Sequence, residues 1–337
     1  MARKKKYSKE ISADKPGLRF ATPEEVAEYR AKRLKCNILA DISCGIGGQT
    51  IAFAKQCEKV FAIDLDPVKV KHARENCRRY GITNVEFFCG DALSREIISK
   101  IPEVDIIFSD PARPPSEERR DIRNLQPPID KVMEAYAHKT TSFAFEVPPQ
   151  LTPERIPFSC EKEYLSFKGK LNRLNLYFGD LKKCDISATT LPSEETLCST
   201  GSKTNVEEAE KLEMFAFEPD PVILQAGLLG ELSDSIETEC SLKAYIVDSK
   251  RMLLTSKNNC MHPFFKNCYE VTDIVDPDPT TINQKLRQHK AGNALLRGNV
   301  NPKHYWEFRN IVEDGLEGET KFHLFLTPEK AIICRKI

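Results

Sequence analysis

Residues 37–49 read Asn-Ile-Leu-Ala-Asp-Ile-Ser-Cys-Gly-Ile-Gly-Gly-Gln, an apolar run that leads into a glycine-rich turn. The apolar run predicts a buried strand, and the residues from Gly47 onward predict a helix. Glycines let the backbone turn sharply and approach a ligand closely, and the first turn of the helix offers free N–H groups. Such a turn can hold several nucleotide-like ligands, so its neighbours decide which one.

Strand and helix signals alternate around this turn. Strands of five or six residues separated by helices predict right-handed β-α-β units and a mainly parallel sheet, which makes the fold class α/β and Rossmann-like. We expect strands at 37–42, 59–64, 85–89, 104–109 and 141–147, and helices at 22–34, 47–57, 67–80, 92–100 and 129–137.

The character of the sequence changes after about residue 155. Short antiparallel strands are expected there, and residues 190–212 are rich in Ser, Thr and Glu, which predicts an exposed polar loop. We therefore expect a basic flexible N-terminus at 1–20, the α/β domain at 21–155 and a smaller α+β domain at 156–337.

An acid stands at the end of each of the first two predicted strands, and another follows the third. Asp41 precedes the glycines, where a carboxylate repels a pyrophosphate but attracts the cationic amino group of a methionine moiety. Asp64 stands 19 residues after Gly45, a spacing typical of acids that accept ribose hydroxyls. Asp91 is placed to accept the adenine amino group. Together they fit S-adenosylmethionine (AdoMet) better than NAD. The neighbours that complete the candidate cofactor contacts are Cys44, Gly47, Leu65 and Ala92.

Several stretches between residues 22 and 93 resemble trimethylguanosine synthase and related class I methyltransferases of the RNA cap guanine-N2 family. They are Thr22-Pro-Glu-Glu-Val-Ala-Glu, Cys44-Gly-Ile-Gly-Gly-Gln-Thr-Ile, Ala62-Ile-Asp-Leu-Asp-Pro-Val-Lys-Val, and Tyr80-Gly-Ile with Cys89-Gly-Asp. The resemblance implies a class I methyltransferase domain that binds AdoMet at Asp41, Gly45, Asp64 and Asp91.

The segment after the fourth predicted strand, Ser109-Asp-Pro-Ala-Arg113, carries the candidate catalytic residues. In the related amino-group methyltransferases this position holds an acid or amide, two prolines and an aromatic ring. This chain keeps Asp110 and Pro111, whereas Ala112 and Arg113 replace the second proline and the ring. We expect Asp110 to orient an acceptor amine and Pro111 to stiffen the turn. Arg113 is expected to stack on a base or hold a phosphate, with an anchoring salt bridge as the alternative.

Two C-terminal stretches resemble a THUMP-like domain, which implies a second domain concerned with RNA. They are Glu218-Pro-Asp-Pro-Val-Ile-Leu-Gln-Ala-Gly-Leu and Leu295-Leu-Arg-Gly-Asn-Val. Basic and aromatic residues in this half predict a phosphate-binding patch, or alternatively a solvated helix face with Trp306 in the core. These residues are Lys285, Arg287, Lys290, Arg297, Lys303, Tyr305, Trp306 and Arg309.

Composition sets limits on these interpretations. The 50 basic and 50 acidic side chains leave no net charge, so global charge provides no argument for a nucleic-acid partner. No apolar run approaches the roughly 20 residues of a membrane span, and the basic N-terminus lacks the apolar segment of a secretory signal. We therefore expect a cytoplasmic protein with no membrane partner. The 12 cysteines include no C-x-x-C pair, so buried thiols are expected rather than a metal site.

The sequence thus predicts an AdoMet-dependent methyltransferase that acts on RNA, with a tRNA or rRNA guanine amine as the favoured acceptor and no metal. A methyltransferase of a small molecule or protein remains an alternative, as does an RNA-binding module that retains the cofactor pocket without catalysis. A Rossmann oxidoreductase is disfavoured by Asp41 and by the absence of a full G-x-G-x-x-G motif. No sequence pattern indicates an oligomeric state.

Overall fold

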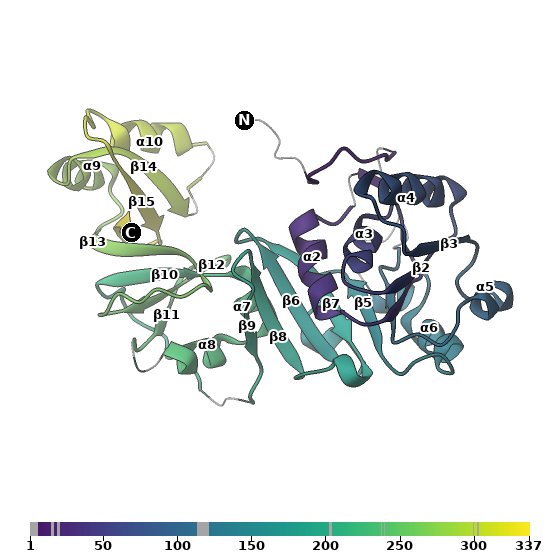
Figure 1. Ribbon diagram of the computed structural model, residues 1–337. Coiled ribbons are helices and arrows are strands. Elements are labelled where there is room, and N and C mark those ends of the chain that lie inside the picture. The colour runs from purple at the N-terminus through teal and green to yellow at the C-terminus, as the bar shows by residue number, and fades with distance from the viewer. Residues whose placement is uncertain are drawn as a thin grey trace. The chain divides into compact units, whose positions relative to one another are not determined.

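The computed structural model describes residues 6–14, 17–18, 21–112, 121–201, 204–236, 238, 240–298, 300–301 and 303–337. The chain divides into two compact units, Met1–Ser199 and Thr200–Ile337 (Figure 1). The predicted fold class is confirmed, because a Rossmann-like α/β unit precedes an α+β unit.

The first unit contains a nine-stranded sheet in the order β3-β2-β1-β4-β5-β7-β6-β8-β9. The strands from β3 to β5 run parallel, whereas β7 is antiparallel to both of its neighbours. The strand bounds are β1 (Ile38–Asp41), β2 (Lys59–Asp64), β3 (Val85–Cys89), β4 (Ile106–Ser109), β5 (Phe143–Val147), β6 (Glu161–Phe167), β7 (Leu171–Tyr177), β8 (Ile186–Leu191) and β9 (Glu195–Cys198).

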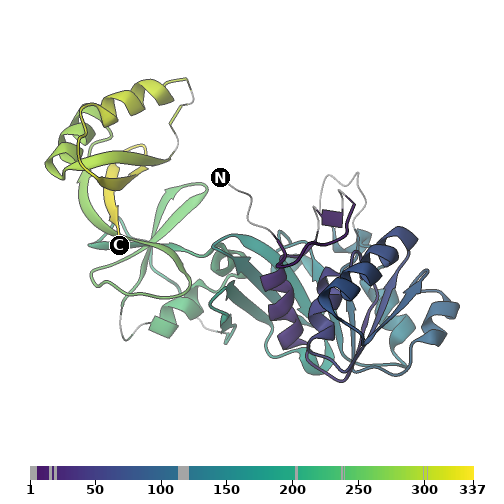
Figure 2. The ribbon, with the colours of Figure 1, turned by 45° about the horizontal axis from the view of Figure 1, so that its top comes forward.

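Helix α2 (Glu24–Arg33) precedes β1, and the other helices connect the parallel strands. These are α3 (Gly48–Ala54), α4 (Pro67–Tyr80), α5 (Arg95–Lys100) and α6 (Ile129–Tyr136). The unit also has 3-10 turns at Ile122–Asn124, Pro153–Arg155 and Gly179–Leu181. Helix α4 has a complete set of end signals: the Asp66 side chain accepts the Val68 N–H, Pro67 occupies the first turn, and Gly81 ends the helix with φ of 74°. Figures 1 and 2 show α2, α3 and α4 side by side on one face of the sheet.

The main core of this unit lies between α2, α3 and the sheet. Ala27 and Leu34 of α2 pack with Phe53 of α3 against the strands. The Phe53 ring meets Phe108 of β4 edge to face at 5.0 Å between centroids, a favoured aromatic geometry. This packing fixes the helix that follows the glycine-rich turn relative to the strand that ends beside Asp110.

The boundary between the two units differs from the expected one at residue 155. Strands β6 to β9 extend the first sheet through β7, which pairs with β5, so the first unit ends at Ser199. The change in the sequence near residue 155 therefore marks the change from parallel to antiparallel pairing. The expected polar loop at 190–212 begins at the end of β8 and includes β9. The residues of this edge strand are exposed or half-buried, so it needs few large apolar side chains.

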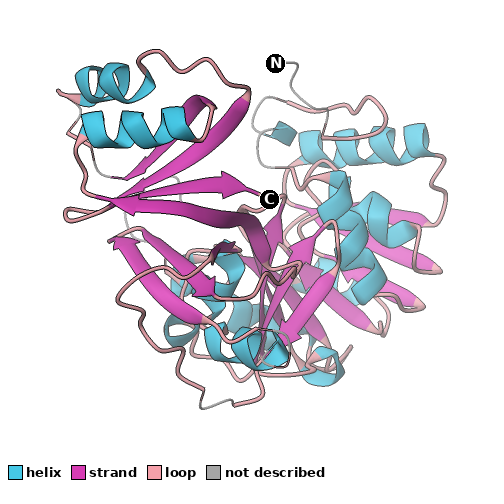
Figure 3. Cartoon of the chain, turned by 90° about the vertical axis from the view of Figure 1, so that its left-hand side faces the viewer, coloured by secondary structure: helices cyan, strands magenta, loops and turns pink. Residues whose placement is uncertain are grey.

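The second unit contains a seven-stranded sheet in the order β11-β12-β10-β13-β16-β15-β14. Only β14 and β15 pair in parallel among its strands as described. Its elements are β10 (Phe215–Pro219), α7 (Pro221–Ala226), α8 (Leu229–Ile236), β11 (Lys243–Asp248), β12 (Arg251–Ser256), β13 (Phe265–Val275), α9 (Pro279–Gln288), β14 (Ala291–Gly298), α10 (Tyr305–Glu313), β15 (Thr320–Leu326) and β16 (Ala331–Lys336). Figure 3 shows α9 and α10 side by side, and their apolar residues form one core with β14 to β16.

Within the described residues, no helix combines the length and apolar character needed to cross a bilayer. The same residues hold no cluster of three or more His, Cys, Asp or Glu side chains arranged to bind a metal ion.

Candidate cofactor and acceptor site

The glycine-rich turn connects β1 to α3 and needs glycine at two positions. Gly45 and Gly47 have φ of +55° and +84°, values that side chains disfavour. A Cβ on Gly47 would also lie 3.0 Å from Ala73 of α4, whereas a Cβ on Gly45 would meet no atom within 4 Å. The turn is therefore packed against α4 on one side and has open space beside Gly45.

Asp64 ties the end of β2 to this turn. Its Oδ2 accepts the Gly45 N–H at 2.9 Å, and its Oδ1 accepts the Asp66 N–H at 3.0 Å. A carboxylate oxygen has more than one acceptor direction, so each oxygen keeps capacity for a further donor. The adjacent Leu65 side chain is 72% exposed and offers an apolar surface beside the acid.

Asp41 is buried beneath the turn, only 1% exposed. Its Oδ2 accepts the Thr50 hydroxyl of α3 at 2.7 Å. Burial raises the pKa of Asp41 to about 7, against the opposing effect of the Thr50 hydrogen bond. The neighbouring Cys44 is also buried, and its N–H donates to the Ile63 carbonyl at 2.8 Å, which closes the turn against β2.

Asp91 and Ala92 follow β3 in a turn that α6 supports. Asp91 is exposed, and one of its oxygens accepts the Leu93 N–H at 2.9 Å. The Ala92 carbonyl accepts the buried Tyr136 hydroxyl at 2.7 Å. Because β3, β2, β1 and β4 are neighbouring parallel strands, the predicted cofactor acids lie along one edge of the sheet.

Asp110 follows β4 at the same edge. Its N–H donates to the Ser43 hydroxyl, so the acceptor segment is hydrogen-bonded to the glycine-rich turn. The residue is exposed, but its carboxyl group lies among protein groups that raise its pKa to about 7: loss of hydration has the largest effect, and the Glu146 carboxylate adds to it. Arg30 and Arg173 act in the opposite direction.

Backbone hydrogen bonds join the segment after Asp110 to Gln126. Pro111 is buried, and Ala112 exchanges two hydrogen bonds of 2.8 and 2.9 Å with Gln126. Arg113 lies outside the described residues, so the proposals for its role stay predictions.

Sequence reasoning missed a cluster of buried charges next to Asp110. Arg30 of α2 is 1% exposed and forms an ion pair with Glu146 of β5. Glu146 also pairs with Arg173 of β7 at 2.6 Å. Two signals could have found the cluster: an arginine on the Ala27–Ala31 face of an amphipathic helix, and a lone acid in the apolar strand Phe143–Val147.

Three basic residues of the predicted phosphate-binding patch make ion pairs within the second unit. Lys285 pairs with Asp273 at 3.0 Å, Arg287 with Asp314 at 3.1 Å, and Arg309 with Glu313 at 2.9 Å. The alternative that placed Trp306 in the core is wrong, since this side chain is 66% exposed. The Arg309 guanidinium lies 5.8 Å from the Trp306 ring centroid.

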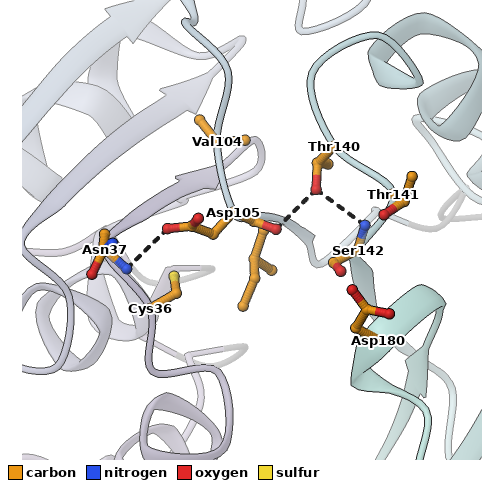
Figure 4. A pocket seen from close by; sticks show the side chains of 9 residues that line it. Cys36, Asn37, Val104, Asp105, Thr140, Thr141, Ser142 and Asp180 are labelled. Atoms are coloured by element: carbon orange, nitrogen blue, oxygen red, sulfur yellow. Dashed lines mark hydrogen bonds between the residues drawn. The ribbon is translucent and has the colours of Figure 1, made fainter.

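The opposite edge of the sheet holds an open pocket of about 470 Å³, at the amino ends of β1, β4 and β5. Figure 4 shows the side chains that line it. Its Asp105 carboxylate accepts the N–H groups of Asn37 and Ile38 at 2.9 and 2.7 Å. The Asp105 carbonyl accepts the Thr140 hydroxyl at 2.8 Å. Asp105 therefore has a structural role, since it joins the segment before β1 to the segment before β4.

Comparison with known proteins places the first unit near methyltransferases. Residues 36–147 match the model of the RNA cap guanine-N2 methyltransferase family. An uncharacterized S-adenosylmethionine-dependent methyltransferase of Mycobacterium tuberculosis is 25% identical over 219 residues, 63% of this chain and 58% of that protein. Trimethylguanosine synthase of Schizosaccharomyces pombe is 41% identical over 78 residues, 21% of this chain and 32% of that protein.

The fold has a counterpart that includes both units. The crystal structure of a Porphyromonas gingivalis W83 protein, described as a "putative methyltransferase", has a TM-score of 0.75. The aligned region covers 96% of this chain and 83% of the other chain, at 16% sequence identity. At this identity the similarity establishes the fold alone. The chain matches less than two thirds of the Mycobacterium tuberculosis relative, namely 58% of its length.

Proposed function

We propose that this protein is an AdoMet-dependent methyltransferase whose acceptor is an RNA base, with an exocyclic guanine amine of tRNA or rRNA as the favoured target. The observation that carries the proposal is the convergence of Asp41, Asp64, Asp91 and Asp110 on one sheet edge around the turn at Gly45 and Gly47. The family match at residues 36–147 and the AdoMet-dependent relative support the cofactor and the reaction.

The residues at this edge have the chemistry that AdoMet requires. Asp64 keeps acceptor capacity for the ribose hydroxyls, and the exposed Leu65 offers an apolar contact for adenine. The open space beside Gly45 leaves room for the ligand, and Asp41 supplies negative charge toward the amino group. Cys44, Gly47, Asp91 and Ala92 complete the proposed contacts. Bound AdoMet would supply the electrophilic methyl group.

Asp110 is the proposed catalytic residue. As a carboxylate it accepts an N–H of the acceptor amine and directs the nitrogen lone pair toward the site of transfer, which is catalysis by orientation and electrostatics. Pro111 restricts the turn, and Arg113 is proposed to contact the base or a phosphate.

An RNA acceptor rests on the family match and on the curated relatives, which include trimethylguanosine synthase. We further propose that the second unit is THUMP-like and contacts the RNA, with the exposed Trp306 as one stacking surface.

We also propose that the protein is cytoplasmic. All of its cysteines lie within the described residues and are free thiols, which is typical of proteins in a reducing compartment. A small-molecule or protein acceptor and a non-catalytic RNA-binding module remain the competing functions.

Two measurements test the proposal. Calorimetry with AdoMet and with NAD should show binding of AdoMet alone, and binding of NAD alone would refute the cofactor. Protein incubated with methyl-labelled AdoMet and total RNA from cells lacking the gene should transfer label to RNA. Label found only in protein or small molecules would replace the RNA acceptor, and RNA binding without any transfer would favour the binding module.

A further inference from the structure

The buried Arg30 side chain contacts three of the elements that form the proposed site. Its Nη1 donates to Gln49 of α3 at 2.8 Å, its Nε donates to Asn175 of β7 at 3.1 Å, and its Nη2 pairs with Glu146 of β5. The guanidinium also lies 5.1 Å from the ring centroid of Phe108 in β4, two residues before Asp110. One side chain thus links the helix after the glycine-rich turn to β5 and β7 and lies beside β4, the strand that the acceptor segment follows.

A second buried arginine on the same helix shows what a purely structural cluster looks like. Arg33 pairs with Glu161 at 2.6 Å and with Glu163 at 3.1 Å, both on β6. One cation therefore faces two carboxylates, and hydroxyl groups of Tyr29 and Tyr177 donate to Glu163. These contacts join α2 to β6 and β7.

The Arg30 cluster lies nearer to the acceptor segment. Arg30 and Arg173 share the Glu146 carboxylate of β5, and β5 pairs with β4. The Arg30 guanidinium also lies beside Phe108 of β4, so this cluster adjoins the strand that Asp110 follows.

We propose that Arg30 is a positioning residue of the acceptor site: through Gln49, Glu146 and Asn175 it holds α3, β5 and β7 in place beside β4, the strand that Asp110 follows. This inference rests on the proposed function.

The positioning role is tested by separating binding from turnover. Arg30→Lys should bind AdoMet within about threefold of the parent yet transfer label to total RNA at least about tenfold more slowly, because one ammonium cannot replace a guanidinium that bridges three partners. Parent-like turnover in Arg30→Lys would overturn positioning.

Arg33→Lys is the matched control, since it makes the same change in a buried cation of the same helix that pairs with β6. It should keep AdoMet affinity and turnover within about threefold of the parent protein. If Arg30→Lys does not fold, Gln49→Ala removes only the Arg30 contact with α3 and should also slow turnover, and unchanged turnover there would count against positioning. Failure of the parent protein to bind AdoMet would refute the proposed function, whereas an equal loss of turnover in Arg33→Lys and Arg30→Lys would overturn the positioning role alone.

Discussion

The two edges of the parallel strands use aspartate differently. At the amino edge, Asp105 accepts two backbone N–H groups and fixes the start of β1 to β4 (Figure 4). At the carboxyl edge, Asp64 keeps acceptor capacity, while Asp41 and Asp110 have raised pKa values. Asp105, whose carboxylate hydrogen-bonds to the backbone, stabilises the fold. Acids whose surroundings disfavour their charged form, as at Asp41 and Asp110, indicate a functional site.

The largest expected effect is at Asp110. Asp110→Ala should lower kcat by about 100- to 1,000-fold, the usual cost of removing one group that orients or stabilises the reacting centre. AdoMet affinity should stay within a few fold, as measured by calorimetry. A loss of affinity equal to the loss of turnover would assign Asp110 to the cofactor.

Asp64 should show the reverse pattern. Asp64→Ala removes the acceptor of the Gly45 N–H and the proposed ribose contact, so AdoMet affinity should fall by about 10- to 100-fold, the value of a hydrogen bond to a charged group. Calorimetric Kd values of Asp64→Ala and Asp64→Asn measure this. Unchanged affinity in both variants would remove Asp64 from the cofactor site.

The raised pKa of Asp41 leads us to expect that AdoMet affinity depends on pH. Its pKa of about 7 means that the carboxylate needed opposite a cationic amino group is lost as pH falls below 7. AdoMet affinity should therefore weaken by up to about tenfold per pH unit below 7, and Asp41→Asn should flatten this dependence. Kd values between pH 5.5 and about 8.5 test it; a parent affinity independent of pH would contradict the role.

The smallest functional effect is expected at the amino edge. Asp105→Ala leaves two backbone N–H groups without their acceptor and should cost about 1 kcal/mol of stability in urea unfolding. Turnover per folded molecule and AdoMet affinity should not change. A clear loss of either would show that the two edges are coupled.

The parts of the site that sequence predicts well are local. The turn at Gly45 and Gly47 and the acids at the strand ends were predictable because strand alternation and the strand-end rule operate over short stretches of chain. Arg30 and Glu146 were not, because their pairing joins positions 116 residues apart and depends on sheet order. The unit boundary was misplaced for a similar reason, since antiparallel strands that extend a parallel sheet have the composition of a separate domain.

The partners of Arg30 also have a consequence for the order in which the chain is made. Asn175, which accepts its Nε–H, follows it by 145 residues. At about 5–20 residues per second, a ribosome needs about 7–30 seconds to reach that position. During this interval Arg30 lacks its partner on β7. The hydrogen bonds of Arg30 are therefore complete only after β7 has emerged.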